Sequence, residues 1–226
     1  MLGYAVESAT KDARQAAAAL RRAVFVDEMG ARAEIEDDRF DAIAEHLVVR
    51  AGDRVVGTLR LATGAAYTGR EFDLSPLRTD PRDIAEIGRM CLHPAHRGGA
   101  AGAALLIGAV ERLRSRGVGL IVGTASFLGT DADRHMPALR ALRDAALAPS
   151  AMRPRAYGAE AVAVEGRGDA RDMRGVPTLI KTYLRAGAWV GEGAWRDDGF
   201  NCIDVCMVMD LARLRLPDAV RREARA

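Results

Sequence analysis

Apolar residues recur along the chain at helical spacing in some segments and in short continuous runs in others. A first helix is predicted from Thr10, whose side chain can cap it, to about Met29. Two apolar runs follow, Leu47–Arg50 and Val55–Leu61, and the segment Ala51-Gly52-Asp53 between them predicts a hairpin. The first quarter of the sequence is therefore expected to form one helix and a pair of antiparallel strands.

Further along, apolar strand runs alternate with amphipathic helices. In chain order we expect a strand over Ile84–Leu92, a helix ending at Gly117, a strand over Val118–Ala125, helices over Asp131–Leu147 and Pro177–Gly187, and strands over Trp189–Trp195 and Ile203–Met209. No linker, repeat or low-complexity run divides the 226 residues, so we expect a single domain over 1–226. The order of elements predicts an α/β fold, with a mixed twisted sheet and helices on both faces.

Composition narrows the class of protein. Apolar residues make up 49% of the chain and aromatic residues 5%, so small and aliphatic side chains are expected to fill the core. The net charge of +2 excludes a strongly basic nucleic-acid binder. No run is long enough to span a bilayer, and Met1–Ala9 lacks the basic and apolar regions of a signal peptide. A cytoplasmic protein is therefore expected.

The cysteines and histidines do not form a recognisable metal or disulfide pattern. Cys202 and Cys206 fall on one face of a predicted strand, about 13 Å apart, too far for a bridge. Together with Cys91 they are expected to be buried, reduced thiols. His93 and His96 lack a further cluster of ligands, so we predict no metal site.

A strand that ends in a glycine-rich loop carries the main candidate chemistry. Glu86 lies in the apolar strand Ile84–Leu92, where a lone carboxylate is costly to bury, so it is either functional or ion-paired with Arg89 or Arg60. The glycines at 98, 99 and 102 permit close approach of a ligand, and the helix that follows directs its positive end toward them. The segment can therefore combine an acid–base group with an anion site.

The loop Arg97-Gly98-Gly99-Ala100-Ala101-Gly102 resembles the acyl-donor signature of the GNAT acyltransferases, Gln/Arg-x-x-Gly-x-Gly/Ala, with Ala100 at the first of its glycine positions. The resemblance implies a GNAT-like fold and a thioester donor. It also implies a β-bulge near Gly88 or Arg89. On an unbroken strand Glu86 and Arg89 would face opposite sides, and such a bulge would bring them to the same side.

Two branches of the GNAT enzymes share further motifs with this chain. The residues that resemble the acyl-homoserine-lactone synthases are Arg21, Phe25, Asp38, Asp41, Arg60, Phe72, Glu86 and Arg89. The segments that resemble the ornithine-lipid N-acyltransferases are 38–41, 45–47, 124–131, 177–185, 188–194 and 200–205. This second resemblance covers roughly residues 20 to 210, and its C-terminal motifs favour the lipid family.

The resemblance implies roles for individual residues. Glu86 is implied as the general base, acting directly or through water, with Arg89 as a second catalytic residue. The residues implied to contact the acyl donor are Cys91, Leu92, His93, Arg97, Gly98, Gly99, Gly102, Ser126 and Phe127. The residues implied to contact the amino-acid acceptor are Asp38, Asp41 and Arg60.

Simpler interpretations remain open for several of these residues. The acidic run that holds Asp38 and Asp41 could be a solvated loop, and Arg60 could brace that loop instead of facing the acceptor. Phe127 is equally a core residue. Arg112 and Arg116 are either a solvated helix face or, because acyl carrier protein is acidic, candidates for docking it.

The resulting prediction is an N-acyltransferase that moves a 3-hydroxylated fatty acyl group from acyl carrier protein to the α-amine of ornithine, giving a lyso-ornithine lipid. The acyl-phosphopantetheine thioester is the co-substrate, and no metal or redox cofactor is implied. The lipid product implies contact with the inner face of the membrane. The alternatives are an acyl-homoserine-lactone synthase, an N-acyltransferase for another amino acid such as glutamine, and a non-catalytic module that binds acyl carrier protein.

Overall fold

The structure, a computed structural model, describes residues 3–35 and 39–215. Nine strands of the described residues form one sheet in the order β1-β2-β3-β5-β6-β11-β10-β8, with β9 paired to β11. These strands are β1 Tyr4–Ser8, β2 Glu45–Ala51, β3 Arg54–Thr63, β5 Asp83–Leu92, β6 Val118–Leu128, β8 Ala161–Val162, β9 Trp189–Val190, β10 Ala194–Asp197 and β11 Cys202–Asp210. Strands β4 Phe72–Asp73 and β7 Arg155–Ala156 pair separately. Among the strand pairs in the described part of the chain, β5 and β6 run parallel and the others antiparallel, so the sheet is mixed, as predicted.

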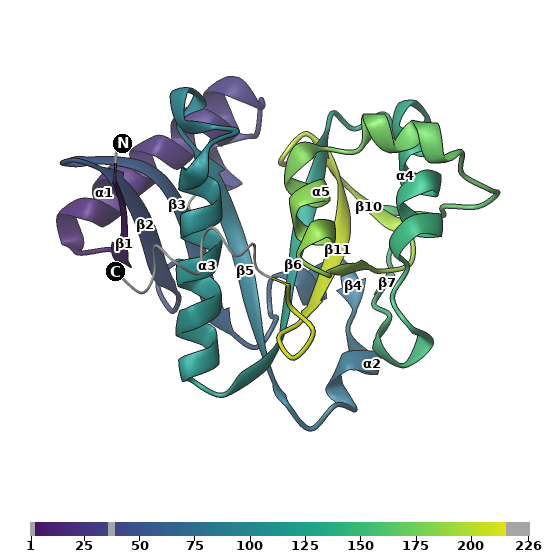
Figure 1. Ribbon diagram of the computed structural model, residues 1–226. Helices are drawn as coiled ribbons and strands as arrows, with labels where there is room; N and C mark the ends of the chain where they lie inside the picture. Colours follow the sequence, from purple (N-terminus) through teal and green to yellow (C-terminus); the bar gives the residue numbers. More distant parts are fainter. Residues whose placement is uncertain (1–2, 36–38, 216–226) are drawn as a thin grey trace.

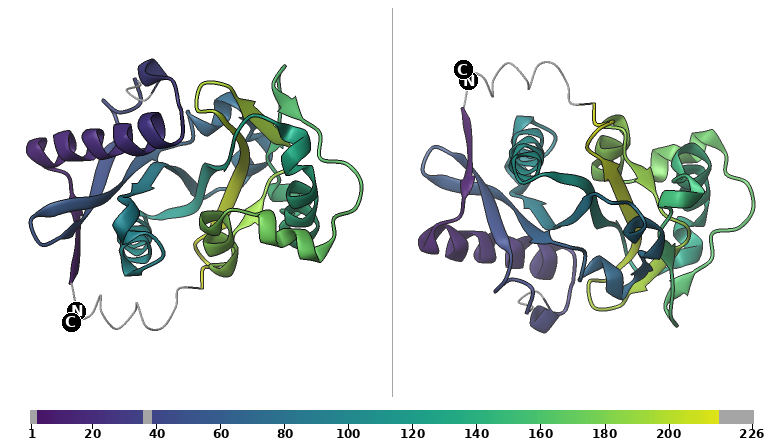
Figure 2. Two further views of the ribbon diagram at one scale, coloured as in Figure 1. Left: turned by 90° about the horizontal axis from the view of Figure 1, so that it is seen from above. Right: turned by 90° about the horizontal axis from the view of Figure 1, so that it is seen from below.

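Helices cover both faces of this sheet. The α-helices are α1 Lys11–Arg21, α2 Ser75–Arg78, α3 Ala100–Ser115, α4 Ala132–Ala146 and α5 Thr178–Arg185. Shorter helical segments are η1 Arg22–Glu28, η2 Ala33–Ile35, η3 Thr68–Arg70, η4 Pro94–His96, η5 Ser150–Met152 and η6 Ala170–Gly175. Helix α1 lies on the opposite face from α3 and α5 (Figure 2). The predicted α/β architecture is therefore confirmed.

Side chains alternate between the two faces of the sheet along each strand, so neighbouring residues pack against different helices. Leu47 and Leu59 pack in one cluster with Leu105 of α3 and Ile180 of α5. Val48, one residue along, points to the other face and packs against α1. Each strand in this part of the sheet thus buries side chains on both faces, which is why its sequence is a continuous apolar run.

Strands β5 and β6 separate after Glu86. They pair over Asp83–Glu86 and then diverge, β5 staying with β3 and β6 with β11 (Figure 1). The register of β5 against β3 shifts between Thr58 and Arg60, and Arg89 has a φ of 53°. The bulge predicted near Gly88 or Arg89 is therefore present. A Cβ at Gly123 would lie 2.2 Å from the Ile87 carbonyl oxygen, so β6 can approach β5 this closely, where the two strands begin to diverge, only with glycine there.

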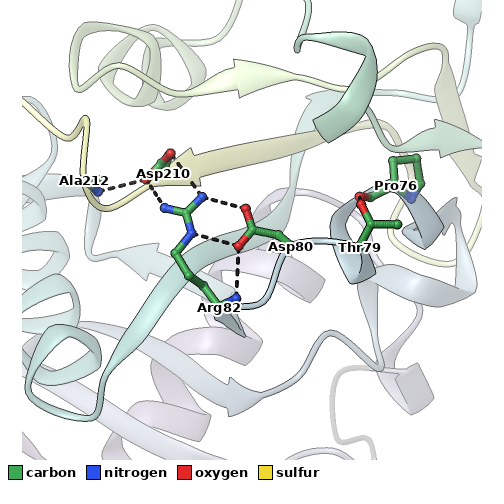
Figure 3. Close-up of polar contacts among 6 residues, drawn as sticks. All are labelled: Pro76, Thr79, Asp80, Arg82, Asp210 and Ala212. Carbon is green, nitrogen blue, oxygen red and sulfur yellow. Dashed lines mark hydrogen bonds and ion pairs between the residues drawn. The ribbon is translucent and has the colours of Figure 1, made fainter.

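Ion pairs join β5 and β11 at the end of the sheet away from the gap between β5 and β6. Arg82, just before β5, donates from Nε and Nη2 to Asp80 at 2.8 Å each, and from Nη1 to Asp210 at 2.8 Å (Figure 3). Asp210 is the last residue of β11, so this one guanidinium connects the start of β5 to the end of β11. The parallel pairing of β5 and β6 lies beside this connection, and the two strands diverge away from it.

The predicted elements largely agree with the structure, but several differ. The helix predicted to Met29 is α-helical only to Arg21 and continues as the π-helix η1. The single strand predicted over Trp189–Trp195 is wrong, because it is divided into β9 and β10. The edge strand β1, the short strands β4, β7 and β8, and the short helix α2 were not predicted. The three cysteines are buried and free, as expected.

Candidate active site

The opening between β5 and β6 forms a cleft of about 600 Å³. Its apolar lining comes from η1, β5, α3 and α5 and includes Val24, Phe25, Met29, Met90, Leu106, Leu179 and Tyr183. Polar side chains lie among them, chiefly Arg89, Ser126 and Asp204, together with Tyr67. The cleft can therefore hold a long apolar chain next to a charged group.

Most residues implied to contact the donor line this cleft. They are Cys91, Leu92, Arg97, Gly98, Gly99, Gly102 and Ser126. The Arg97 guanidinium donates to the Leu92 carbonyl at 3.1 Å and forms a two-point ion pair with Glu28 at the end of η1. Gly98 adopts a φ of 72°, which favours glycine. The glycine-rich loop is thus held against the end of β5, and its role in donor binding stays a prediction.

His93 and Phe127 are not among the lining residues. The His93 side chain accepts from the Ala95 amide as the cap of η4. Phe127 is buried in the main core, its ring 5.4 Å from that of His135, which matches the simpler interpretation. Phe127 faces the opposite side of β6 from its neighbour Ser126 because side chains alternate along a strand.

Backbone amides of β5 also face the cleft. The His93 amide donates to the Val56 carbonyl of β3 at 2.8 Å, so it is occupied. Because hydrogen bonding alternates along an antiparallel pair, the Leu92 N–H points away from β3 and toward the opening. Of the Leu92 and His93 amides, that of Leu92 is therefore the one that can donate to an oxyanion in the cleft.

Glu86 and Arg89 both contact Tyr67. Glu86 is 3% exposed, and its Oε2 accepts from the amides of Tyr67 and Thr68 at 3.0 and 3.1 Å. The Arg89 guanidinium lies 4.8 Å from the centre of the Tyr67 ring and 4.2 Å from that of Phe200. The bulge thus brings both residues to one side of the sheet. Burial raises the pKa of Glu86, although the two amide hydrogen bonds and Arg60 oppose the shift.

Asp41 and Arg60, two of the implied acceptor residues, do not line the cleft. Arg60 donates to Asp41 Oδ1 at 2.8 Å, and Arg21 contacts Asp41 Oδ2 at 2.8 Å. Burial alone would raise the pKa of Asp41, but the hydrogen bonds from both guanidinium groups lower it. Of the two interpretations of Arg60, the geometry supports the one in which it braces the acidic loop. Asp38 lies outside the described residues.

Arg112 and Arg116 lie near the far end of α3 from the glycine-rich loop. Arg112 is about 15 Å along the helix from Gly102, at 1.5 Å per residue. Both arginines form ion pairs with Glu45 of β2, that of Arg112 at 3.2 Å. Their docking role stays a prediction, but the geometry places them away from the cleft.

Sequence reasoning missed a group of carboxylates beside the cleft. Glu71, Asp197 and Asp204 each place an oxygen within 4.8 Å of the other two. Asp204 lines the cleft and accepts from the Ser126 hydroxyl at 2.5 Å. A signal was available, since Asp204, like Glu86, is a lone carboxylate in an apolar strand. Its partners, however, come from segments far apart in the sequence, and no spacing rule connects them.

Burial and neighbouring charges strongly raise the pKa values of Glu71 and Asp204. Burial, then Asp204 and Asp197, raises the pKa of Glu71 to about 9, and burial raises the pKa of Asp204 to about 6. The other groups that act on Glu71 or feel its charge are Tyr67, Arg70, Glu86 and Cys206. At neutral pH Glu71 therefore holds a proton in the folded protein.

This shift predicts a pH-dependent effect on stability. Between pH 4.5, where an unfolded glutamate titrates, and about 9, the folded state binds more protons than the unfolded state, so Glu71 lowers stability as pH rises. We expect Glu71→Gln to gain stability over the parent protein progressively across this window. Urea unfolding of both proteins at pH 5, 7 and 8.5 measures this gain in unfolding free energy. A gain that stays constant with pH would contradict the raised pKa of Glu71.

None of the described helices combines the length and the apolar content needed to cross a membrane.

Comparison with known families and structures agrees with this architecture. The family described as "Acetyltransferase (GNAT) domain" matches residues 20–107. The crystal structure of FeeM, an N-acyl amino acid synthase from uncultured soil microbes, superposes with a TM-score of 0.59, covering 93% of this chain and 92% of that one at 11% identity. Escherichia coli ElaA gives a TM-score of 0.54 at 16% identity, over 93% of this chain and all of that one (100%). These structures share the fold.

Proteins related in sequence identify the family more narrowly than the shared fold does. An L-ornithine N(alpha)-acyltransferase of Rhodobacter capsulatus is 37% identical over 92% of this chain and 90% of its own length. Proteins of the same name from Brucella abortus and Agrobacterium fabrum are each 30% identical, over 91% and 88% of this chain and 83% and 78% of their own lengths. Residues 20–107 therefore match the GNAT domain, and the chain belongs to the L-ornithine N(alpha)-acyltransferase family.

Proposed function

We propose that this protein transfers a long, 3-hydroxylated fatty acyl group from acyl carrier protein to the α-amine of ornithine, forming a lyso-ornithine lipid. The observation that carries the proposal is the cleft of about 600 Å³, with apolar walls and the charged groups Arg89 and Asp204. Apolar walls suit a fatty acyl chain, and opposite charges suit a zwitterionic amino acid. The names of the relatives supply the acceptor.

The donor is proposed to lie along the free edge of β5. Its thioester carbonyl would accept a hydrogen bond from the Leu92 N–H, which stabilises the oxyanion as it forms. The phosphate of phosphopantetheine would meet the glycine-rich loop and the start of α3, whose backbone amides favour an anion. The acyl chain would then occupy the apolar part of the cleft.

The chemical step is nucleophilic substitution at the thioester carbonyl. The α-ammonium, with an ordinary pKa near 8, must lose a proton before its nitrogen attacks the carbonyl carbon. Glu86 does not line the cleft, so we propose that it accepts this proton through a water molecule. The C–N bond forms, the C–S bond breaks, and the second proton lost by the attacking nitrogen protonates the departing thiolate. The thioester supplies the activated acyl group, so the proposed reaction uses no metal or redox cofactor.

The proposed partner, acyl carrier protein, predicts a charge-dependent encounter. Arg185 is exposed and lines the cleft, whereas Arg112 and Arg116 lie near the far end of α3. We expect Arg185→Glu to raise the KM for acyl carrier protein roughly tenfold at low salt and less at high salt, because surface charges mainly govern encounter. The double variant Arg112→Glu with Arg116→Glu is the comparison. A larger effect in the double variant would favour docking on α3 instead.

Lipid mass spectrometry of cells expressing the chain tests the proposed function. The expected product is an ornithine amide of a 3-hydroxy fatty acid, absent from cells expressing Glu86→Gln at equal protein level. Because that product carries a long acyl chain, we expect it in the membrane fraction. A different headgroup on the same acyl chain would reassign the acceptor, and no new acylated amino acid would contradict the proposal.

A further inference from the structure

The carboxylates of Glu71, Asp197 and Asp204 form a cluster, here named the carboxylate pocket, that the chemical step above does not use. Glu71 immediately precedes β4, Asp197 ends β10 and Asp204 lies within β11, so three separate segments converge on it. Asp204 also lines the acyl cleft. The pocket is therefore continuous with the place where the acceptor must lie.

Two of the three acids are held in place by hydrogen bonds. Asp197 accepts from the amides of Gly199 and Phe200 at 2.8 Å each. Asp204 accepts from Ser126 at 2.5 Å and from the Cys202 thiol at 3.4 Å. The positions of these carboxylates are thus fixed before any ligand arrives.

Glu71 differs from its two neighbours. Its side chain is only 3% exposed, and its Oε2 is buried with no hydrogen-bond partner among the described residues. A buried polar atom without a partner is costly, and the two neighbouring carboxylates oppose ionisation of Glu71, which holds a proton while no cation is bound. Both costs fall if a cation with several N–H donors enters the pocket.

We propose that Glu71, Asp197 and Asp204 bind the side-chain ammonium of the acceptor, an inference that rests on the proposed acylation of ornithine. A primary ammonium offers three donors, one for each carboxylate, and ornithine carries it on a short arm. Arg89, which acts electrostatically on Asp204, is placed to meet the acceptor's carboxylate. The pocket would therefore select a diamino acid over one with a neutral side chain.

The test compares ornithine with norvaline, which has the same carbon chain without the terminal ammonium. With one acyl carrier protein thioester, kcat/KM is measured for both acceptors in the parent protein and in Glu71→Gln. We expect the ratio of the two values to fall about 10- to 100-fold in the variant, the usual cost of losing a hydrogen bond to a charged group. Asp198→Asn, an exposed acid next to Asp197, is the matched control and should leave the ratio unchanged.

A second measurement does not depend on turnover. Ornithine should raise the Tm of the parent protein more than norvaline does, and Glu71→Gln should remove that difference while remaining folded without ligand. An unchanged acceptor ratio in a folded Glu71→Gln variant that still acylates ornithine would overturn the pocket and leave the proposed function standing. Absence of ornithine acylation by the parent protein would instead overturn the proposed function.

A metal ion is the competing occupant of three carboxylates. If Mg²⁺ or Ca²⁺ raises the Tm of the parent protein but not of Glu71→Gln, and ornithine has no such effect, the pocket is a metal site and the inference is wrong. We expect the reverse, with the Tm responding to ornithine and not to either metal.

Discussion

Replacing Glu86 with glutamine should lower turnover by roughly two to four powers of ten, the range expected when a general base is lost. The substitution keeps the side chain's size and retains an oxygen to accept from the amides of Tyr67 and Thr68. The fold should therefore survive. Because burial raises the pKa of Glu86, the acidic limb of the pH–rate profile should lie above the range of an ordinary glutamate and disappear in the variant. Steady-state kinetics from pH 5 to 9 measures both effects.

Glu192→Gln is the matched control, since Glu192 is a half-exposed carboxylate that pairs with Arg153 and Arg155, away from the cleft. It should turn over like the parent protein. Near-normal turnover by a folded Glu86→Gln variant would show that Glu86 is structural. Asp204, which lines the cleft and has a pKa raised to about 6, would then be the next carboxylate to test as the base.

Asp41→Asn should destabilise the protein by about 3 kcal/mol, because it removes the carboxylate shared by two buried arginines. Arg21 and Arg60 are only 3% and 2% exposed, whereas Asp41 is 19% exposed, which places the cost at the lower end for a buried pair. The lowered pKa of Asp41 means that its contribution is present above the ordinary aspartate range and is lost as pH falls through the lowered value. The difference in unfolding free energy should therefore shrink in acid.

Urea unfolding at pH 7 and at pH 3 measures this effect, with the exposed Asp53→Asn in the hairpin turn as control. A loss below about 1 kcal/mol, typical of a surface pair, would contradict the brace. The ratio of ornithine to norvaline turnover separates the two interpretations of Asp41. If Asp41 only braces the loop, the ratio stays unchanged in folded Asp41→Asn. If Asp41 binds the acceptor, the ratio falls in that variant.

Local sequence signals account for most of the secondary structure. The hairpin of β2 and β3 and the helix after the glycine-rich loop follow from apolar periodicity and turn residues. The two-residue strands β8 and β9 are too short to produce a period. The bulge at Arg89 follows from the family resemblance and not from the pattern, because nothing in an apolar run marks the residue that steps out of register.

The candidate site was only partly predictable, because the sequence shows contiguous motifs but not contacts between distant segments. The glycine-rich loop is contiguous, so its residues could be named from the sequence and they do line the cleft. The partners of Asp41 and Glu71 come from segments tens of residues or more away, and only the folded chain shows them. An acidic run was thus more conspicuous in the sequence than the buried acids that gather beside the cleft.

The most direct test of the proposed function uses the purified protein, one 3-hydroxyacyl carrier protein, and an equimolar mixture of ornithine, lysine, glutamine and glycine. Products are identified by mass spectrometry with acyl-coenzyme A as a parallel donor. We predict that Nα-acyl ornithine is the main product, that acyl carrier protein is the better donor, and that Glu86→Gln abolishes most of the signal. Glutamine as the main acceptor, or no transfer from the carrier-protein thioester to any amino acid, would contradict the proposed function.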